Sequence, residues 1–121
     1  QSKVMFLRAK QGSDVLSRIF RERRIPYEEH ALYELGVQEQ KRDAVITKEP
    51  DYIAFGSAMG ARAYFEGMEK KGIRNTRSRY VCIGEQCAKE VRKYVTEPPL
   101  VAAEADVEAI ADCLCREGRQ D

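Results

Sequence analysis

The sequence predicts an α/β domain in which parallel strands alternate with helices, and three observations support this fold class. Stretches with apolar residues at helical spacing follow most of the strand-like runs. Glycine or proline separates successive segments. Short runs of strand length recur along the whole chain, at 3–7, 27–35, 52–55, 80–83 and 100–102.

The first two strands flank one amphipathic helix. Residues 3–7 are apolar enough for a buried strand, and a helix capped by Gly12 or Ser13 follows. Pro26 stops this helix, because proline lacks the N–H that a helix interior needs. The apolar face of the helix contains Val15, Leu16, Ile19 and Phe20.

The second strand, at 27–35, alternates, which places Tyr33 and Leu35 on one side and Leu32 on the other. Beyond it the pattern weakens, and 43–46 is compatible with part of a short helix.

Two regular units and an edge strand follow. After the strand at 52–55, a helix is expected to end at Gly72, and after the strand at 80–83 a second helix is expected. Residues 100–102 suit an edge strand, and Val107 to Leu114 a last helix. The inner faces of the two middle helices comprise Ala61, Tyr64, Phe65 and Met68, then Val91, Tyr94 and Val95.

Right-handed crossovers between such units produce a parallel sheet covered on both faces. We therefore predict one flavodoxin-like, three-layer domain over residues 1–121, with five parallel strands in the order 2-1-3-4-5. The chain enters its first strand almost at once and does not begin with methionine, so we expect it to be a piece of a longer protein.

Bulk charge and hydropathy bear on the class of partner. Lys and Arg number 21 against 20 Asp and Glu, a formal net charge of +1, so no global field favours nucleic acid. No apolar run approaches the roughly 20 residues that cross a bilayer. We therefore expect neither nucleic acid nor a membrane as a partner.

The cysteines and the single histidine do not have the spacing of a metal site. Cys82 lies in an apolar strand, Cys113 and Cys115 do not share a helix face, and His30 is the only histidine. Nucleotide-binding glycine loops and a nucleophile elbow are also absent from the sequence. We expect no metal and no cofactor, and reduced thiols in the cytoplasm.

Two apolar runs break into glycine and small polar residues and then continue as helices. They are Phe55-Gly56-Ser57-Ala58-Met59-Gly60 and Cys82-Ile83-Gly84-Glu85-Gln86-Cys87. Each is typical of a strand, a tight turn and a helix N-terminus, whose unpaired N–H groups favour anions. In a parallel sheet both turns lie at the edge where the strands end, which is where open α/β folds bind ligands.

These motifs, in their order along the chain, resemble the second lobe of uroporphyrinogen-III synthase. The resemblance rests on the two glycine turns, with Ala88 opening a helix, and on Phe6-Leu7-Arg8, His30-Ala31-Leu32-Tyr33 and the segment 98–114. It implies one half of a two-lobed lyase that cyclises hydroxymethylbilane, an acidic linear tetrapyrrole, with loss of water and inversion of ring D. It also implies that no cofactor is needed, that a first lobe is missing, and that the isolated lobe is nearly inactive.

The resemblance also implies roles for particular residues. Tyr33 matches a tyrosine used near the reacting hydroxymethyl group, so it would be the general acid. Ser57 matches a serine that holds a substrate carboxylate, and Arg8 is a candidate partner for a propionate or acetate. The proposed substrate-binding backbone donors are Ser57, Ala58, Met59, Gly60, Gly84, Gln86 and Cys87.

Each of these residues also has a structural interpretation. Ser57 is equally typical of a helix N-cap, Tyr33 of a strand aromatic packed on the sheet, and Arg8 of a surface arginine without a specific contact.

The second turn departs from the family pattern. Gly84-Glu85-Gln86-Cys87 replaces Gly-Pro-Thr-Thr, which removes two hydroxyls and adds a carboxylate, and Met59 replaces a small polar residue. Glu85 opposes a bound carboxylate unless its side chain turns away. This departure favours the alternative function, a non-catalytic flavodoxin-like module that binds a ligand or a partner protein.

Overall fold

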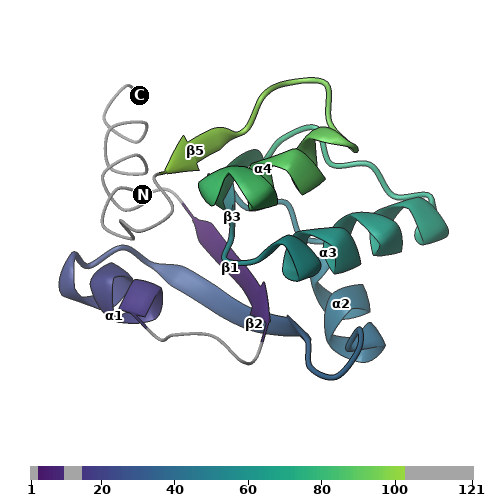
Figure 1. The fold of residues 1–121 in the computed structure, drawn as a ribbon. Coiled ribbons are helices and arrows are strands. Elements are labelled where there is room, and N and C mark those ends of the chain that lie inside the picture. The colour runs from purple at the N-terminus through teal and green to yellow at the C-terminus, as the bar shows by residue number, and fades with distance from the viewer. Residues whose placement is uncertain (1–2, 10–14, 103–121) are drawn as a thin grey trace.

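The computed structural model describes residues 3–9 and 15–102 and contains a five-stranded parallel sheet in the order β2-β1-β3-β4-β5 (Figure 1). This confirms the predicted fold class and strand order. The strands are β1 (Val4–Ala9), β2 (Tyr27–Tyr33), β3 (Tyr52–Phe55), β4 (Arg79–Ile83) and β5 (Leu100–Ala102). The helices are α1 (Val15–Glu22), α2 (Glu39–Val45), α3 (Ala58–Lys71) and α4 (Gly84–Arg92).

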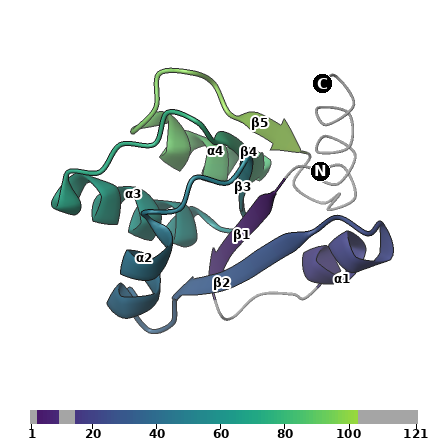
Figure 2. The same cartoon turned by 180° about the vertical axis from the view of Figure 1, so that it is seen from behind.

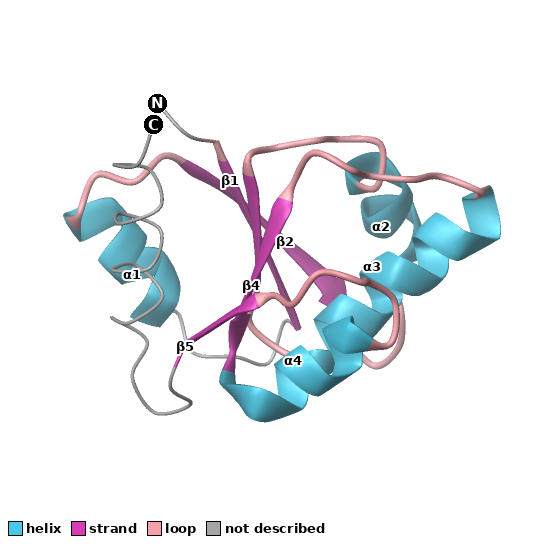
Figure 3. Ribbon diagram, turned by 90° about the horizontal axis from the view of Figure 1, so that it is seen from above, coloured by secondary structure: helices cyan, strands magenta, loops and turns pink. Residues whose placement is uncertain are grey.

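Helices cover both faces of the sheet. In Figure 3, α1 lies on one side of the strands, and α2, α3 and α4 lie on the other. Alternate residues of β1 serve the two faces: Val4 and Phe6 pack in the cluster that contains Phe20 of α1, whereas Met5 and Leu7 pack in the cluster under the other three helices. Strand β3 is buried along its whole length, as expected for a central strand with two covered faces.

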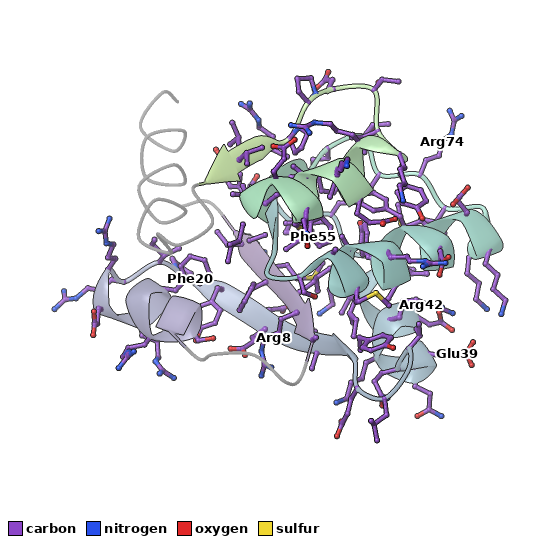
Figure 4. All side chains as sticks on the ribbon, viewed as in Figure 1. Arg8, Phe20, Glu39, Arg42, Phe55 and Arg74 are labelled. Carbon is purple, nitrogen blue, oxygen red and sulfur yellow. The ribbon has the colours of Figure 1, made fainter. Side chains whose placement is uncertain are left out.

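The larger core is built around aromatic rings of α3 and the strands. The predicted inner face of α3, formed by Ala61, Tyr64, Phe65 and Met68, is buried. Phe55 lies between the sheet and this helix (Figure 4), with its ring centroid 5.7 Å from that of Tyr64. The predicted C-terminal stop is also confirmed, because Gly72 adopts the left-handed conformation with φ 65° and ends α3.

The second strand ends earlier than predicted. β2 stops at Tyr33, and Leu35 is not a strand residue beside it but lies in a tight turn with φ 56° and 91% exposure. Hydrogen bonds from Glu34 N to Gly36 O (2.8 Å) and from Gln38 N to Leu32 O (2.8 Å) close this turn. The alternation at 27–35 misled the prediction because it continued for two residues into the turn.

Other boundaries shift by a few residues. β1 extends past residue 7 to Ala9, and α2 begins before residue 43, at Glu39, and ends at Val45. Tyr94 and Val95 lie after α4 rather than on it, although both pack against the core from the following loop. The predicted last helix, with Cys113 and Cys115, lies outside the described residues.

Candidate functional site

The carboxyl ends of the strands bring both glycine turns to one edge of the sheet. β1, β3 and β4 pair in parallel, so the Ser57 turn after β3 and the Gly84 turn after β4 are neighbours. Helices α3 and α4, which begin at these turns, run side by side over the same face (Figure 1; Figure 2). We call this region the carboxyl edge.

Ser57 caps α3 with its side chain. Its backbone is extended, and its Oγ accepts a hydrogen bond of 3.0 Å from the N–H of Gly60. This hydrogen bond confirms that Ser57 is the N-cap of α3. It also engages the N–H of Gly60, which was one of the predicted substrate-binding donors. The first helical bond of α3 runs from Ala61 N to Ser57 O, and within the described part of the chain the N–H groups of Ala58 and Met59 have no acceptor. These two amides are therefore available to an anion.

Gly60 brings α3 close to the end of β1. A Cβ at this position would lie 3.4 Å from the Cα of Arg8 and 3.1 Å from Ser57 Oγ. The predicted glycine thus allows the helix start and the first strand to approach each other. Its own N–H is held by the cap and is not free for a ligand.

The N-terminus of α4 has no side-chain cap. Ile83 occupies the cap position and makes no such bond, and Gly84 has a positive φ of 78° that few other residues adopt. Gln86 is exposed, whereas Cys87 is only 2% exposed. The Cys87 side chain therefore points inward, whereas Glu85 and Gln86 are exposed and Gly84 is buried.

Glu85, the added carboxylate, turns along its own helix. Its carboxylate accepts a hydrogen bond from Arg92 two turns further on, and this contact lowers the pKa of Glu85. The side chain is thus paired with a cation at the other end of α4. Glu85 would oppose a bound anion unless its side chain turned away, and its side chain does turn toward Arg92.

Arg8 is engaged with a carboxylate of its own chain. Its Nε donates to Glu29 of β2 and its Nη1 to Ala9 O at 3.0 Å, and the hydroxyl of Ser17 on α1 donates to the same carboxylate. Burial raises the pKa of Glu29, but the hydrogen bonds from Ser17 and Arg8 outweigh it, so the pKa is lowered. Arg8 lies at the carboxyl edge, as predicted (Figure 4), and in this structure its guanidinium has a partner there.

Tyr33 ends β2 at the same edge, on the far side of β1 from the Ser57 turn. It pairs with Ala9 in the strand register and forms a bridge with Val37. Its side chain is partly exposed, and among the described residues no hydrogen bond engages its hydroxyl. Tyr33 and the Ser57 turn are therefore separated by the width of β1.

A groove at the opposite, amino edge was not predicted. It has a volume of about 800 Å³ and lies between the loops 72–78 and 93–99. Phe65, Tyr80 and Tyr94 line it, with the Phe65 and Tyr94 rings stacked at 4.9 Å and 8°. Arg74, Arg79 and Lys93 contribute positive charges to its lining, and Glu69 and Glu97 contribute negative charges. The available signal in the sequence was the aromatic residues of three separate segments, which only the fold brings together.

Asn75 orders one wall of this groove. Its Oδ1 accepts from the backbone N–H groups of Arg77 (3.0 Å) and Ser78 (3.1 Å), and its Nδ2 donates to Tyr64 Oη at 3.3 Å. The loop before β4 is thereby tied to the buried face of α3. From this loop, Arg74 extends outward into solvent (Figure 4).

The described residues contain neither a membrane-spanning helix nor a cluster of metal ligands. No helix within residues 3–9 and 15–102 is both long and apolar enough to span a membrane. Over the same ranges, no three His, Cys, Asp or Glu side chains group as a metal ion would require.

The fold and the carboxyl edge define a flavodoxin-like α/β domain with backbone amides exposed where its central strands end. A family model described as uroporphyrinogen-III synthase HemD matches residues 1–112. The chain therefore belongs to the uroporphyrinogen-III synthase HemD family. No curated protein matches the chain.

Among solved structures, the chain is similar to a novel cobalamin-binding protein from Desulfitobacterium hafniense DCB-2, with a TM-score of 0.59 and 13% identity. The match covers 97% of this chain and 58% of that protein, so the chain spans little more than half its length. At this identity the similarity concerns the fold alone.

Proposed function

We propose that this chain is one lobe of a uroporphyrinogen-III synthase, the lyase that converts hydroxymethylbilane to uroporphyrinogen III with loss of water and inversion of ring D. The family match over residues 1–112 is the observation that carries the proposal. Two further features support it: both glycine turns lie at one edge, and the amides of Ala58 and Met59 have no acceptor among the described residues.

In this proposal the lobe binds substrate carboxylates through backbone donors. Ala58 and Met59 contribute the free N–H groups of α3, and Gly84 and Gln86 those of the uncapped first turn of α4. Ser57 holds the first group in place, since its hydroxyl closes the turn onto Gly60. Backbone donors of this kind are fixed before the substrate arrives and therefore cost little reorganisation.

Tyr33 is the proposed general acid. Its phenol donates a proton as the C–O bond of the hydroxymethyl group breaks, and water leaves. The resulting azafulvene cation is attacked by ring D to give a spiro intermediate, which opens and closes again with ring D inverted. The proton that ring D loses on closure returns to the Tyr33 phenolate. The Tyr33 side chain is partly exposed at the carboxyl edge, which leaves it accessible to a substrate.

A second lobe completes the site in this proposal. One lobe supplies a single carboxyl edge, whereas ring closure requires that the two ends of a flexible tetrapyrrole be held together. The chain alone would therefore be nearly inactive, and the parent protein would work in the cytoplasm with Cys82 and Cys87 reduced.

Reconstitution with a first lobe tests this proposal. The chain is joined to the first lobe of an active family member, and freshly made hydroxymethylbilane is assayed for the type III isomer. We expect type III product from the joined protein and only the spontaneous type I isomer from either lobe alone. Tyr33→Phe in the joined protein removes the hydroxyl of the proposed general acid and should lower kcat at least tenfold. Type I product alone from the joined protein would overturn the proposal.

The groove at the amino edge supports a second candidate function, a non-catalytic module that binds a ligand or a partner protein. Its volume of about 800 Å³ lies within the range of ligand sites. A titration with uroporphyrin, followed through backbone amide resonances, separates the two candidates. Shifts at Ala58 and Met59 favour the enzyme lobe, and shifts confined to residues 72–80 and 93–99 favour the module.

A further inference from the structure

One buried side chain connects the two glycine turns of the carboxyl edge. The Sγ of Cys87, in the first turn of α4, lies 3.7 Å from the carbonyl oxygen of Phe55 and 3.8 Å from that of Ser57. Phe55 ends β3 and Ser57 caps α3. The thiol therefore reaches from the second turn to the backbone of the first.

The surroundings of Cys87 suit a donor rather than a nucleophile. Cys87 is 2% exposed, and Cys82, which pairs with Phe55 in the β3–β4 register, is fully buried beside it. A hydrogen bond with Cys87, together with burial, raises the pKa of the Cys82 thiol. A sulfur that is 2% exposed cannot reach a substrate, but its S–H can donate to a carbonyl.

The pairing of β3 with β4 and the packing of α4 on α3 place the first turn of α4 near the Ser57 turn, but neither supplies a polar contact between the two turns. Gly84 joins β4 to α4 with φ 78°, and Ile83 provides no side-chain cap. A helix start that is connected through glycine and has no cap depends on the side chains beneath it, which here are those of Cys87 and Ala88, both buried. Cys87 is the one of the two with a polar contact to the neighbouring turn.

We propose that Cys87 is a positioning residue whose thiol holds the first turn of α4 against the Ser57 turn, so that their amides act as one anion site. In this role the Cys87 side chain acts through Ser57 and Phe55, beside the direct contact with substrate predicted for its backbone N–H. The identity of the anion, a tetrapyrrole carboxylate, rests on the proposed function. The coupling between the two turns does not.

The inference is tested with substitutions in this chain that distinguish loss of the hydrogen-bond donor of Cys87 from loss of its side-chain volume. Cys87→Ala removes the sulfur, and Cys87→Ser replaces it with a hydroxyl donor. Cys82→Ala is the matched control, since it removes the same side chain from the neighbouring strand. The readouts are the amide resonances of Ser57 to Gly60 without ligand, the dissociation constant for uroporphyrin, and the midpoint of thermal unfolding.

We expect Cys87→Ala to shift the Ser57 and Ala58 amide resonances and to weaken uroporphyrin binding by about threefold to tenfold, the effect of losing one hydrogen bond. In Cys87→Ser the amide resonances should stay where they are in the original chain, and the dissociation constant for uroporphyrin should change by less than about twofold. This should hold even if its midpoint of thermal unfolding falls as far as that of Cys87→Ala. Cys82→Ala should lower the midpoint and leave binding within about twofold. This pattern distinguishes positioning from packing, which all three variants disturb.

The inference is overturned if Cys87→Ala leaves the Ser57 to Gly60 resonances unmoved, or if Cys87→Ser behaves like Cys87→Ala in both resonances and binding. Failure of the proposed function gives a different result. If uroporphyrin does not bind the original chain, the tetrapyrrole assignment is wrong, while the resonances without ligand still decide whether Cys87 couples the two turns.

Discussion

The two edges of the sheet are built in different ways. At the carboxyl edge, backbone groups dominate: two glycine turns, one serine cap and one thiol place amides at an open surface. At the amino edge, large side chains dominate: Phe65, Tyr80 and Tyr94 line a groove whose wall is ordered by Asn75. Under the proposed function, the groove and the site for anions lie at different edges, because a groove requires bulky walls and amides require small residues that leave them uncovered.

The largest effect is expected at the amino edge. Phe65→Ala removes a ring that contacts those of Phe55, Tyr64, Tyr80 and Tyr94, so the free energy of unfolding should fall by about 3–5 kcal/mol. Urea unfolding measures this, and Phe65→Leu, which keeps most of the volume, should cost less. Phe65→Ala should shift the amide resonances of residues 72–80 more than those of Ala58 and Met59. Equal shifts would show that a change at the amino edge also alters the carboxyl edge.

A smaller loss is expected from Gly56→Ala at the carboxyl edge. The added Cβ would lie 2.7 Å from Cε1 and 2.9 Å from Cζ of Phe6, and that ring is confined by Phe20 at 6.1 Å. Overpacking of this kind costs about 1–3 kcal/mol of unfolding free energy. Chemical denaturation of Gly56→Ala, Phe6→Leu and the double variant checks the cause. Strictly additive losses would show that the clash with Phe6 is not responsible.

Removing the cap of α3 should cost about 1 kcal/mol. Ser57→Ala loses the acceptor for the Gly60 N–H, whereas Ser57→Asp restores an acceptor and adds a negative charge. We expect Ser57→Asp to regain stability in thermal unfolding but to bind uroporphyrin more weakly than the original chain. Equal binding by Ser57→Asp would mean that the anion does not lie at this turn.

The Arg8–Glu29–Ser17 cluster should make stability depend on pH. The pKa of Glu29 is lowered in the folded chain, from an ordinary value of 4.5, so the ionised form is the one that folding favours. Its contribution is therefore present above about pH 4.5 and is lost as the pH falls through the lower, folded value.

Unfolding free energies of the original chain and of Glu29→Gln, measured between pH 6 and pH 3, check this dependence. The difference between the two should shrink on acidification. A difference that stays constant over this range would contradict it.

The smallest effect is expected from the exposed ion pair between Glu85 in the first turn of α4 and Arg92 in its last turn. Arg92→Ala should leave stability nearly unchanged and weaken uroporphyrin binding by no more than about fivefold, because Glu85 loses the cation that holds it along the helix. Binding measured for Arg92→Ala and for the double variant with Glu85→Gln checks this. The double variant should bind at least as well as the original chain, and a double variant as weak as Arg92→Ala would exclude Glu85 as the cause.

Local patterns were sufficient for several elements and insufficient for others. Strand β3 has the predicted bounds, and α3 ends at Gly72 as predicted, because burial period and a left-handed glycine are properties of short segments. The turn at Leu35 was not predicted, because leucine rarely adopts a φ of 56° and the alternating pattern continues through this residue. Arg42, 5% exposed and packed where a side chain on Gly67 would otherwise stand, could not be predicted either, because the two residues meet only through the contact of α2 with α3.

The sequence by itself determined that strands and helices alternate, that the sheet is parallel, and therefore that the turns at Ser57 and Gly84 share one edge. Those properties follow from periodicity and chirality, which act along the chain. The tertiary structure alone decided that the Cys87 thiol points to Phe55 and Ser57 and that Arg42 packs against Gly67. Each of these is a choice among several possible partners, and that choice depends on side-chain directions and distances that exist only once the helices have packed on the sheet.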